Sequence, residues 1–456
     1  MNIVLLSPGA GAMYCGNCLR DNALVGELRR RGHAVLMAPL YLPLTLDEPD
    51  ASAGTPIFFS GINVFLDQKA ALFRSAPQWL RNVFRSPDLL RWTGRFAAKT
   101  RPGDIGELTL SMLRGEHGNQ AGQLEELIAW LRLQPAPDVI CLSNALLAGF
   151  ARRLRDALNT PVVCLLAGEE AFLDAMDEPM RRRIWRLLAE QAPAVDRFVA
   201  PSRYFADRMG ARLKLPAGQL TVVPLGLNLE GYRAAPDQPS TCNLQPSTFN
   251  LQPPTPTLGY FARMCRDKGL DTLVAAFIEL KRRGRVPGLR LKIGGSCGPA
   301  DEPFVAGLKA QLGAAGFLGD VEFHPNLNRV QKIAFLRSLT VFSVPALYGE
   351  AFGLYLLEAL AAGVPVVQPR HAAFPEVVAA TGGGVLCEPG DVAALAGAIE
   401  QLLLDPERRQ SLGGAGRRAI HERFGIEQMG EGMLAVLRAV AAAPSRVQAS
   451  DAGSHA

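Results

Sequence analysis

The chain has 456 residues, of which 48% are hydrophobic and 20% are charged, and its formal net charge is only +5. This length exceeds what one compact core accommodates, so we expect two domains of about 200 residues each. The ordinary composition excludes a disordered or fibrous protein, and the weak net charge disfavours a nucleic-acid binder, because such proteins concentrate basic charge.

The start of the sequence, MNIVLLSPGAGAMYCG, has no basic segment and only a strand-length apolar run. No stretch approaches the roughly 18 apolar residues that span a bilayer. We therefore expect a cytoplasmic protein. The eight cysteines are scattered, and Cys141 and Cys164 fall in strand-like runs, which indicates reduced thiols instead of a disulfide framework.

Strand-like and helix-like segments alternate through the first half of the chain. An apolar run at 2–7 ends in a glycine-rich loop, a helical stretch follows, and a second apolar run begins at residue 34. The alternation resumes at residue 138 and continues to residue 226. This order predicts a parallel sheet covered by helices on both faces, in a Rossmann-like domain over residues 1–233.

A less regular insert, residues 42–135, interrupts this alternation. It places basic residues among the aromatic side chains of Trp79, Phe84, Trp92 and Phe96. Two interpretations stay open. The insert forms helices that cap the sheet with a solvated basic face, or it contacts an anionic membrane or gates the acceptor site. The second would make the protein peripheral at the inner face of the membrane.

The second half of the chain repeats the alternation after a break in composition. Residues 234–256 predict an interdomain linker, because they are rich in Pro, Ser, Thr and Gln and duplicate STCNLQP as STFNLQP. Residues 257–425 predict a second Rossmann-like domain. A final helix at 426–443 is expected to cross back to the first domain, and residues 444–456 form a frayed tail.

The segment EAFGLYLLEALAAG begins at Glu350 and carries the strongest functional signal. Glu350 precedes a predicted helix, and Glu358 lies inside it. If both residues were helical, they would lie about 12 Å apart along the axis. That separation is too large for one proton transfer and suits an elongated ligand.

Two further features favour a bound diphosphate. The predicted helix begins around Phe352, Gly353 and Leu354, where free N–H groups and the positive end of the helix dipole attract an anion. Arg263 and Lys268 follow the first strand of the second domain, which would place them at the same crevice. The two cations would stabilise a leaving diphosphate without a metal ion.

Three segments together resemble glycosyltransferase family 4. They are GYFARMCRDKGL for the G-R-x-x-x-x-K-G segment, FSVPALYGEAFGLYLLEALAAGVPVVQP for the E-x7-E signature and GGGVLCEPGDVAALAGAIEQLL for the C-terminal block. They cover most of residues 257–424 in the order of the family. The resemblance implies the GT-B fold, an α/β architecture of two Rossmann-like domains facing each other across a cleft. It also implies a retaining hexosyltransferase that uses a nucleotide-sugar donor.

The resemblance also implies roles for single residues. Glu350 would address the donor sugar, Phe352 to Leu354 its phosphates and Glu358 its ribose, while Arg263 and Lys268 would bind the diphosphate. No metal or other cofactor is expected, and a donor of UDP, GDP or ADP type is a substrate. The acceptor hydroxyl would attack on the face that the diphosphate leaves, with a phosphate oxygen as base. The acceptor stays open: a sugar, a lipid-linked molecule or another small molecule.

The first half matches the family more loosely. Gly9 and Gly11 occupy the place of its glycine-rich loop and are candidate donor-site residues. A dinucleotide fingerprint would require a third glycine where Tyr14 stands, so NAD is not expected. The nearby Cys15 and Cys18 form a CxxC pair, which alone makes no zinc site. This pair shapes the acceptor loop or carries a thiol of lowered pKa.

The histidine that family members commonly place after one of two strands is missing, since no histidine lies between His117 and His324. Asn144 and Glu169 stand at those two positions and are candidates to bind, orient or deprotonate the acceptor. Alternatively, each caps the helix that it precedes. The missing histidine leaves a catalytically inactive sugar-nucleotide binder as one alternative function, and a nucleotide-sugar epimerase of the same fold is another.

Overall fold

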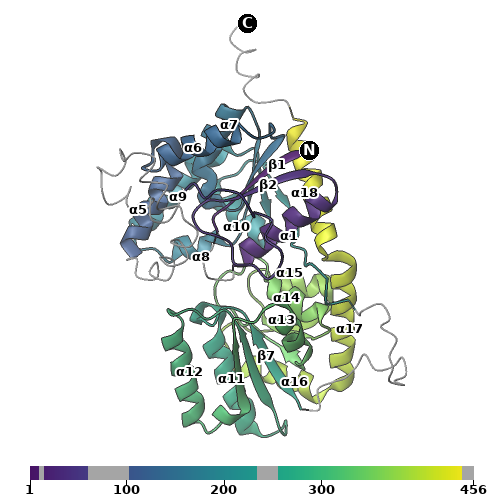
Figure 1. Cartoon of the computed structure of the whole chain (residues 1–456). Coiled ribbons are helices and arrows are strands. Elements are labelled where there is room, and N and C mark those ends of the chain that lie inside the picture. The colour runs from purple at the N-terminus through teal and green to yellow at the C-terminus, as the bar shows by residue number, and fades with distance from the viewer. Residues whose placement is uncertain (10–14, 60–101, 234–254, 444–456) are drawn as a thin grey trace, which may run out of the picture. The chain divides into compact units, whose positions relative to one another are not determined.

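The structure is a computed structural model that describes residues 1–9, 15–59, 102–233 and 255–443. The chain forms two compact units (Figure 1). Unit 1 contains Met1–Pro224 and Glu427–Ala456, and unit 2 contains Leu225–Ile426. Several predicted features lie outside the described residues: the four aromatic residues Trp79, Phe84, Trp92 and Phe96 of the insert, Gly11 and most of the predicted linker.

Unit 1 is built on a parallel sheet whose strands are continuous apolar runs. Such runs form strands that are buried on both faces, as in sheets covered by helices on each side. The six strands described pair in the order β2-β1-β3-β4-β5-β6. Their bounds are β1 (Asn2–Ser7), β2 (Ala34–Pro39), β3 (Val139–Leu142), β4 (Val162–Leu165), β5 (Arg197–Ala200) and β6 (Leu220–Val222).

Helices connect these strands, and residues 102–135 of the insert are largely helical, whereas residues 42–59 contain no helix or strand. The helices of unit 1 are α1 (Gly16–Arg30), α5 (Pro102–Leu113), α6 (Ala121–Leu131), α7 (Ala151–Leu158), α8 (Glu169–Asp174), α9 (Met180–Gln191), α10 (Arg203–Leu213) and α18 (Ile426–Ala441). In α18, the Glu427 carbonyl accepts a hydrogen bond from the Arg31 guanidinium at 2.7 Å. The last helix therefore lies in unit 1 from Glu427 onward.

Unit 2 repeats the parallel architecture with a second sheet. The six strands described pair in the order β12-β11-β10-β7-β8-β9. Their bounds are β7 (Thr257–Phe261), β8 (Arg290–Gly295), β9 (Val321–Pro325), β10 (Val341–Phe342), β11 (Val366–Pro369) and β12 (Gly384–Cys387). Read from β9, this is the strand order of the Rossmann fold, which reverses direction between β7 and β10.

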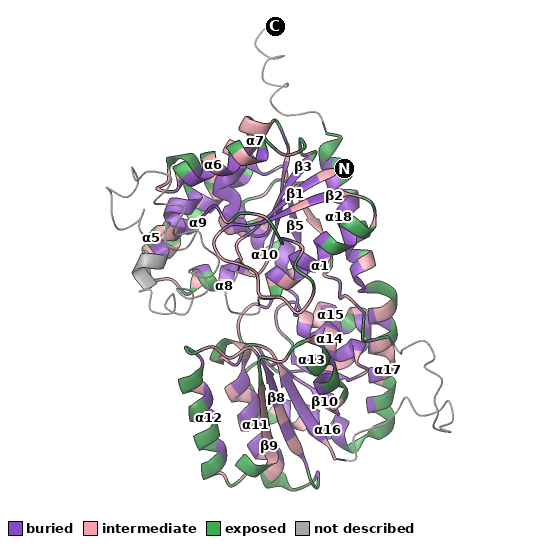
Figure 2. Cartoon of the chain, in the orientation of Figure 1, coloured by how far each residue is buried: buried purple, intermediate pink, exposed green. Residues whose placement is uncertain are grey.

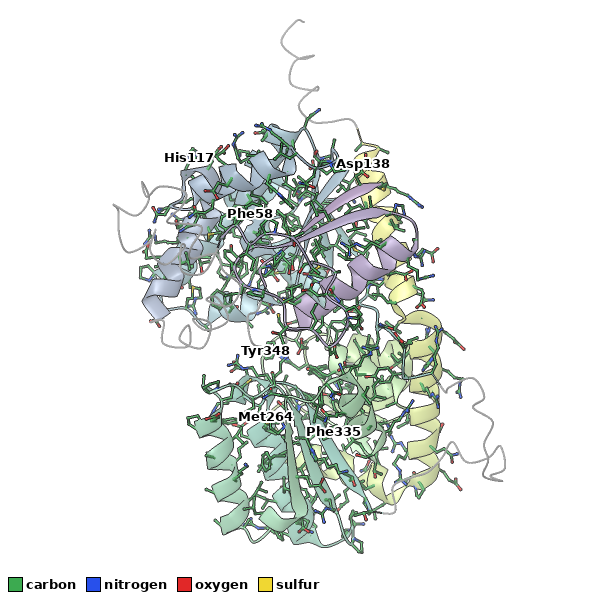
Figure 3. The ribbon with its side chains drawn as sticks, viewed as in Figure 1. Phe58, His117, Asp138, Met264, Phe335 and Tyr348 are labelled. Atoms are coloured by element: carbon green, nitrogen blue, oxygen red, sulfur yellow. The ribbon has the colours of Figure 1, made fainter. Side chains whose placement is uncertain are left out.

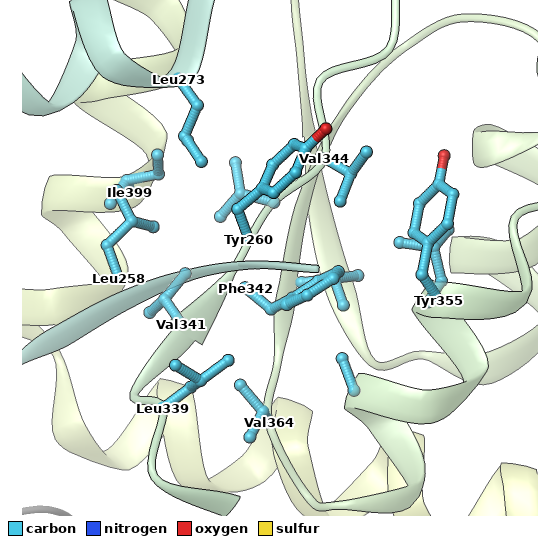
Figure 4. Close-up of a cluster of buried hydrophobic side chains, with 14 of the residues drawn as sticks. Leu258, Tyr260, Leu273, Leu339, Val341, Phe342, Val344, Tyr355, Val364 and Ile399 are labelled. Atoms are coloured by element: carbon cyan, nitrogen blue, oxygen red, sulfur yellow. The ribbon is translucent and has the colours of Figure 1, made fainter. Parts of the chain in front are cut away.

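The helices described in unit 2 are α11 (Leu270–Arg283), α12 (Glu302–Ala314), α13 (Arg329–Arg337), α14 (Leu354–Ala361), α15 (Phe374–Thr381), α16 (Val392–Leu404) and α17 (Pro406–Arg423). Most of them bury one face and expose the other, whereas α14 has no exposed residue. Figure 2 shows the buried central strand β10 and the exposed outer faces of α12 and α17. In the core, Tyr260 and Tyr355 flank Phe342 and point their hydroxyls to the same side (Figure 4).

The boundary between the units differs from the predicted residue 233. Residues 225–233 belong to unit 2, because two arginines of α13 hold their backbone. Arg329 donates to the carbonyl of Asn228 at 2.8 Å, and Arg337 donates to the carbonyl of Gly231 at 2.8 Å. In the described part of the chain, no helix is long and apolar enough to cross a membrane.

Candidate functional site

The candidate site of unit 2 lies where the strand order reverses. Strands β7 and β10 are neighbours there, and their following loops leave the sheet toward different helices. Ligands of open α/β sheets bind outside the carboxyl ends of the strands at such a switch point. The loop after β7 carries Arg263 and Lys268, and the loop after β10 carries Glu350.

Gly269 lets these two loops meet. Its φ of +69° lies in the left-handed region, and a Cβ at this position would lie 1.9 Å from the Pro345 carbonyl oxygen. The Leu347 amide also donates to the carbonyl of Asp267 at 3.4 Å. Since any larger residue would push the loops apart, Gly269 brings Lys268 close to Glu350.

Glu350 is the centre of a polar cluster. Its Oε2 lies 2.7 Å from the Lys268 ammonium and accepts hydrogen bonds from the hydroxyls of Tyr348 at 2.7 Å and Tyr355 at 2.8 Å. Lys268 also donates to the Tyr348 hydroxyl. The Lys268 ammonium lies 4.7 Å from the ring centroid of Tyr348 and 5.2 Å from that of Tyr355. Tyr348 lies at the same end of the sheet as Met264 (Figure 3).

The cluster keeps a buried carboxylate charged. Burial alone would raise the pKa of Glu350, whose exposed fraction is 9%. The Lys268 charge and the hydrogen bonds from Lys268, Tyr348 and Tyr355 outweigh that effect and hold the pKa below its ordinary value. Burial and the Glu350 charge raise the pKa of Tyr355, so this phenol stays a donor. The site is therefore an ionised acceptor surrounded by donors.

Arg263 lies in the same loop as Lys268 but has its own partner. Its guanidinium makes a two-pronged ion pair with the buried Asp301 at 2.9 and 3.1 Å. The Tyr260 hydroxyl fixes the backbone by donating to the Arg263 carbonyl at 2.7 Å. About half of the Arg263 side chain stays exposed, at 49%. The guanidinium is thus held in place with one side available to a ligand.

Helix α14 begins later than its sequence predicts. The predicted start near Phe352 is wrong by two residues, because Phe352 is buried and its ring centroid lies 6.4 Å from that of Phe424. Gly353 caps the helix with a φ of +90°, and Leu354 is its first residue. The N–H groups of the first turn therefore begin at Leu354 and follow directly on the Glu350 loop.

Glu358 lies in the second turn of α14 and is also paired. Its Oε1 lies 2.7 Å from the ammonium of Lys332 on α13, and both side chains are largely buried. Glu350 is not helical, so the predicted separation of about 12 Å along one helix axis does not apply.

Sequence reasoning missed the partners that fix the predicted residues. Tyr348 and Tyr355 lie within five residues of Glu350, and their phenols beside a carboxylate were an available signal. Asp301 and Lys332 come from other loops and helices, and no local pattern links them to Arg263 or Glu358.

Unit 1 has a buried polar network at its own switch point, between β1 and β3. The Asp21 carboxylate accepts from Ser7 at 3.2 Å, from Arg20 at 2.7 Å and from Ser143. Arg20 also donates to the Ser143 carbonyl at 2.7 Å. All four side chains are buried. The network ties α1 to the ends of both strands.

Asn144 and Glu169 hold backbone in the same region. Asn144 Oδ1 accepts from the Leu146 amide at 3.0 Å and caps the short 3-10 helix Ala145–Phe150. Both carboxylate oxygens of Glu169 accept from backbone amides, those of Ala145 at 2.9 Å and Ala167 at 2.6 Å. Burial raises the pKa of Glu169 in spite of these bonds. The capping interpretation is therefore supported for Asn144. It is wrong for Glu169, because Gly168 is the N-cap of α8 and the Glu169 carboxylate binds amides outside that helix. The acceptor role of both residues stays a prediction.

Gly9 meets a packing requirement. Its φ is +76°, and a Cβ there would lie 1.8 Å from the carbonyl oxygen of Leu42. A glycine is thus needed for the contact between the loops after β1 and β2, and the donor-site role of Gly9 stays a prediction. No group of three or more His, Cys, Asp or Glu side chains is placed to hold a metal ion in the described part of the molecule.

Comparison with known families agrees with this architecture. Residues 245–419 match the family described as "Glycosyl transferases group 1", and residues 97–230 match "Glycosyltransferase Family 4". Two similar solved structures are a sucrose-phosphate synthase from Thermosynechococcus elongatus, with TM-score 0.69 and 20% identity, and Anabaena HepE bound to UDP, with TM-score 0.65 and 15% identity. The two matches cover 97% and 96% of this chain, and each covers the whole length of the solved chain. The predicted GT-B architecture is confirmed.

Curated relatives of similar sequence are glycosyltransferases by name. A D-inositol 3-phosphate glycosyltransferase of Segniliparus rotundus is 30% identical over 63% of this chain and 62% of its own length. A GDP-mannose-dependent alpha-(1-6)-phosphatidylinositol monomannoside mannosyltransferase of Mycolicibacterium smegmatis is 30% identical over 60% of this chain and 68% of its own length. The match thus spans somewhat less than two thirds of the first relative. The chain belongs to glycosyltransferase family 4.

Proposed function

We propose that this protein is a retaining glycosyltransferase that transfers a hexosyl group from a nucleoside-diphosphate sugar to an acceptor hydroxyl. The observation that carries the proposal is the Lys268–Glu350 pair at the switch point of unit 2. The pair and its two tyrosine partners gather polar groups at the edge of the sheet where ligands of such folds bind. The family supports a nucleotide-sugar donor.

Glu350 is positioned to recognise the donor sugar. A carboxylate with a lowered pKa accepts hydrogen bonds from sugar hydroxyls at neutral pH. When a sugar binds, its hydroxyls take the place of one or more phenol donors from Tyr348 and Tyr355. The exchange replaces one donor by another, so no buried charge is left without a partner.

Lys268 and Arg263 would stabilise the diphosphate as it leaves. The two cations come from one loop, and the first turn of α14 adds backbone N–H groups and the positive end of its dipole. Charge on the phosphates grows as the glycosidic bond breaks, and fixed cations stabilise that charge without reorganising. We propose that no metal ion takes part.

Glu358 would bind the ribose of the donor. Its ion pair with Lys332 fixes the orientation of the carboxylate. A carboxylate has about four acceptor positions, so hydrogen bonds from ribose hydroxyls are compatible with the ion pair. The acceptor hydroxyl would attack on the face that the diphosphate leaves, with a phosphate oxygen as base, which gives retention.

A thermal-shift experiment with UDP, GDP and ADP tests the donor site. A nucleotide at 100 times its Kd stabilises the folded protein by about 2.7 kcal/mol, so the correct base raises the Tm clearly. Glu358→Gln should weaken this shift, and Glu388→Gln, an exposed position in the same unit, should leave it unchanged. The absence of a shift with every nucleotide would contradict the proposal.

Transfer and retention need a second experiment. Labelled donor is incubated with and without acceptors, and the names of the relatives supply the first panel: inositol phosphates and phosphatidylinositol mannosides. Label should move only when acceptor is present, and NMR of the product should show the anomeric configuration of the donor. An altered free nucleotide sugar would indicate an epimerase, and binding without turnover would indicate an inactive binder.

A further inference from the structure

The proposed transfer reaction makes no use of the CxxC pair at the start of α1. Cys15 is the N-cap residue of the helix and is partly exposed, while Cys18 lies one turn further on and is fully buried. Cys15 at the N-cap and Cys18 at the third helical position lie on the same side of the first turn. The Cys18 side chain lowers the pKa of Cys15, and the Cys15 side chain raises the pKa of Cys18, so the two thiols interact in the reduced protein.

The surroundings of Cys15 favour its thiolate. The hydrogen bond from Cys18 lowers the pKa of Cys15 to about 6, against burial, which raises it. The backbone amides of Cys18 and Asn17 lower it further, and the Asp21 charge raises it. A helix start and a CxxC spacing both stabilise thiolates. Cys15 is thus largely ionised at neutral pH and partly open to solvent.

Other cysteines in the described residues lack this combination. Cys265 and Cys297 are partly exposed, but burial raises the pKa of each thiol. Cys141 and Cys164 are buried in strands β3 and β4, and burial raises the pKa of Cys141 to about 12. Reactivity toward disulfides follows the thiolate fraction and access, so Cys15 should react first.

We propose that Cys15 and Cys18 form a thiol–disulfide exchange site whose oxidant is a small disulfide of the oxidised-glutathione class. The Cys15 thiolate attacks one sulfur of the oxidant, which forms a mixed disulfide and releases one thiolate. Cys18 loses its proton and attacks the Cys15 sulfur, which forms the Cys15–Cys18 disulfide and releases the second thiol. Two protein thiols are oxidised and one small disulfide is reduced to two thiols.

The first step prepares the second. The pKa of Cys18 is raised because its thiol donates to Cys15, because it is buried and because the Cys15 charge is near. A mixed disulfide at Cys15 removes both the charge and the thiolate acceptor. Cys18 then ionises more easily, and it lies within one helical turn of the bond that it attacks.

Oxidation of Cys18 would alter the buried polar network of unit 1. The Ser7 side chain lowers the pKa of Cys18, and the Ser7 hydroxyl donates to Asp21 at 3.2 Å. Asp21 in turn ties the carboxyl ends of β1 and β3 together. A disulfide at Cys18 removes the thiol with which Ser7 interacts, so the redox state is connected to the edge of the sheet where Asn144 lies.

Mass spectrometry of the native protein tests this site. A Cys242→Ser background removes the one cysteine outside the described residues. Oxidised glutathione should convert the protein to a form lighter by two hydrogen atoms, with Cys15 and Cys18 in one crosslinked peptide. In Cys18→Ala the reaction should stop at a glutathione adduct on Cys15, and Cys15→Ala should not react at Cys18.

A second measurement uses the protein without variants of the pair. Iodoacetamide at pH 7 should alkylate Cys15 at least about 10-fold faster than Cys297, because alkylation follows the thiolate fraction. Equal rates, or a glutathione adduct that forms on Cys265 or Cys297 as fast as on Cys15, would overturn the proposal. Neither measurement depends on glycosyl transfer, so failure here leaves the proposed function untouched.

Discussion

Two buried carboxylates show how differently the units treat the same chemical group. Glu350 in unit 2 accepts from an ammonium and two phenols, and its pKa is lowered. Glu169 in unit 1 accepts from two backbone amides, and burial raises its pKa. The donors of Glu350 are side chains, which sugar hydroxyls would replace in the proposed complex, whereas those of Glu169 are backbone amides. Exchangeable partners indicate a binding site, and fixed partners indicate a scaffold.

The largest expected effect on transfer comes from removing the charge of Glu350. Glu350→Gln should lower kcat/KM for transfer at least about 100-fold, which corresponds to about 2.7 kcal/mol. The reason is that glutamine removes the acceptor charge and leaves the Lys268 ammonium without its counterion. Steady-state kinetics and circular dichroism check activity and folding.

Matched variants make the Glu350 result specific. Glu388→Gln changes an exposed carboxylate of the same unit and should leave kcat/KM unchanged. Glu169→Gln should affect stability more than turnover, since Glu169 holds backbone. If Glu169→Gln abolished transfer while the fold stayed intact, the scaffold interpretation of Glu169 would be wrong.

The next effect concerns the loop contact that assembles the cluster. Gly269 and Gly284 stand at the two ends of α11 with φ values of +69° and +66°. Only at Gly269 would a Cβ meet backbone, 1.9 Å from the Pro345 carbonyl oxygen; at Gly284 it would meet nothing within 4 Å. Gly284→Ala should therefore cost about 1 kcal/mol of unfolding free energy, from the left-handed conformation alone.

Gly269→Ala should cost at least about 2 kcal/mol more than Gly284→Ala, because the two loops must separate. Urea unfolding of both variants measures the difference. Nucleotide binding should fall in Gly269→Ala only, since Lys268 moves with the loop. Equal unfolding free energies would show that the contact with Pro345 does not stabilise the site.

The fold and the central site were largely predictable because they rest on local patterns. Apolar runs predicted most strands, and the spacing of Glu350, Glu358, Arg263 and Lys268 selected the family. The partners were not predictable, because contacts such as Arg263 with Asp301 join segments far apart in the chain. The start of α14 was misplaced because the burial of Phe352 decides it, and burial is a tertiary property.

A smaller effect is the pH dependence of the unfolding free energy, to which Glu350 and Glu169 contribute differently. The folded pKa of Glu350 lies below the ordinary 4.5, so its stabilising contribution is complete above pH 4.5 and is lost as pH falls through the folded pKa. The folded pKa of Glu169 lies above 4.5, so stability is highest below pH 4.5 and falls as pH rises through the folded pKa. The two groups respond in opposite directions.

Urea unfolding between about pH 3.5 and 6 measures this opposition. The unfolding free energy of the wild type minus that of Glu350→Gln should increase with pH, and the same difference for Glu169→Gln should decrease. Each change should be on the order of 1 kcal/mol. Parallel changes in both differences would contradict the assignment of their partners.

The smallest effect separates capping from acceptor recognition at Asn144. Asn144→Ala removes the oxygen that accepts from the Leu146 amide and should cost about 1 kcal/mol of unfolding free energy. Asn144→Asp keeps that oxygen and should restore the stability. If capping is the whole role, Asn144→Asp also keeps the KM for acceptor and kcat. If the amide N–H₂ group donates to the acceptor, Asn144→Asp recovers stability but not KM, because aspartate at neutral pH has no hydrogen to donate.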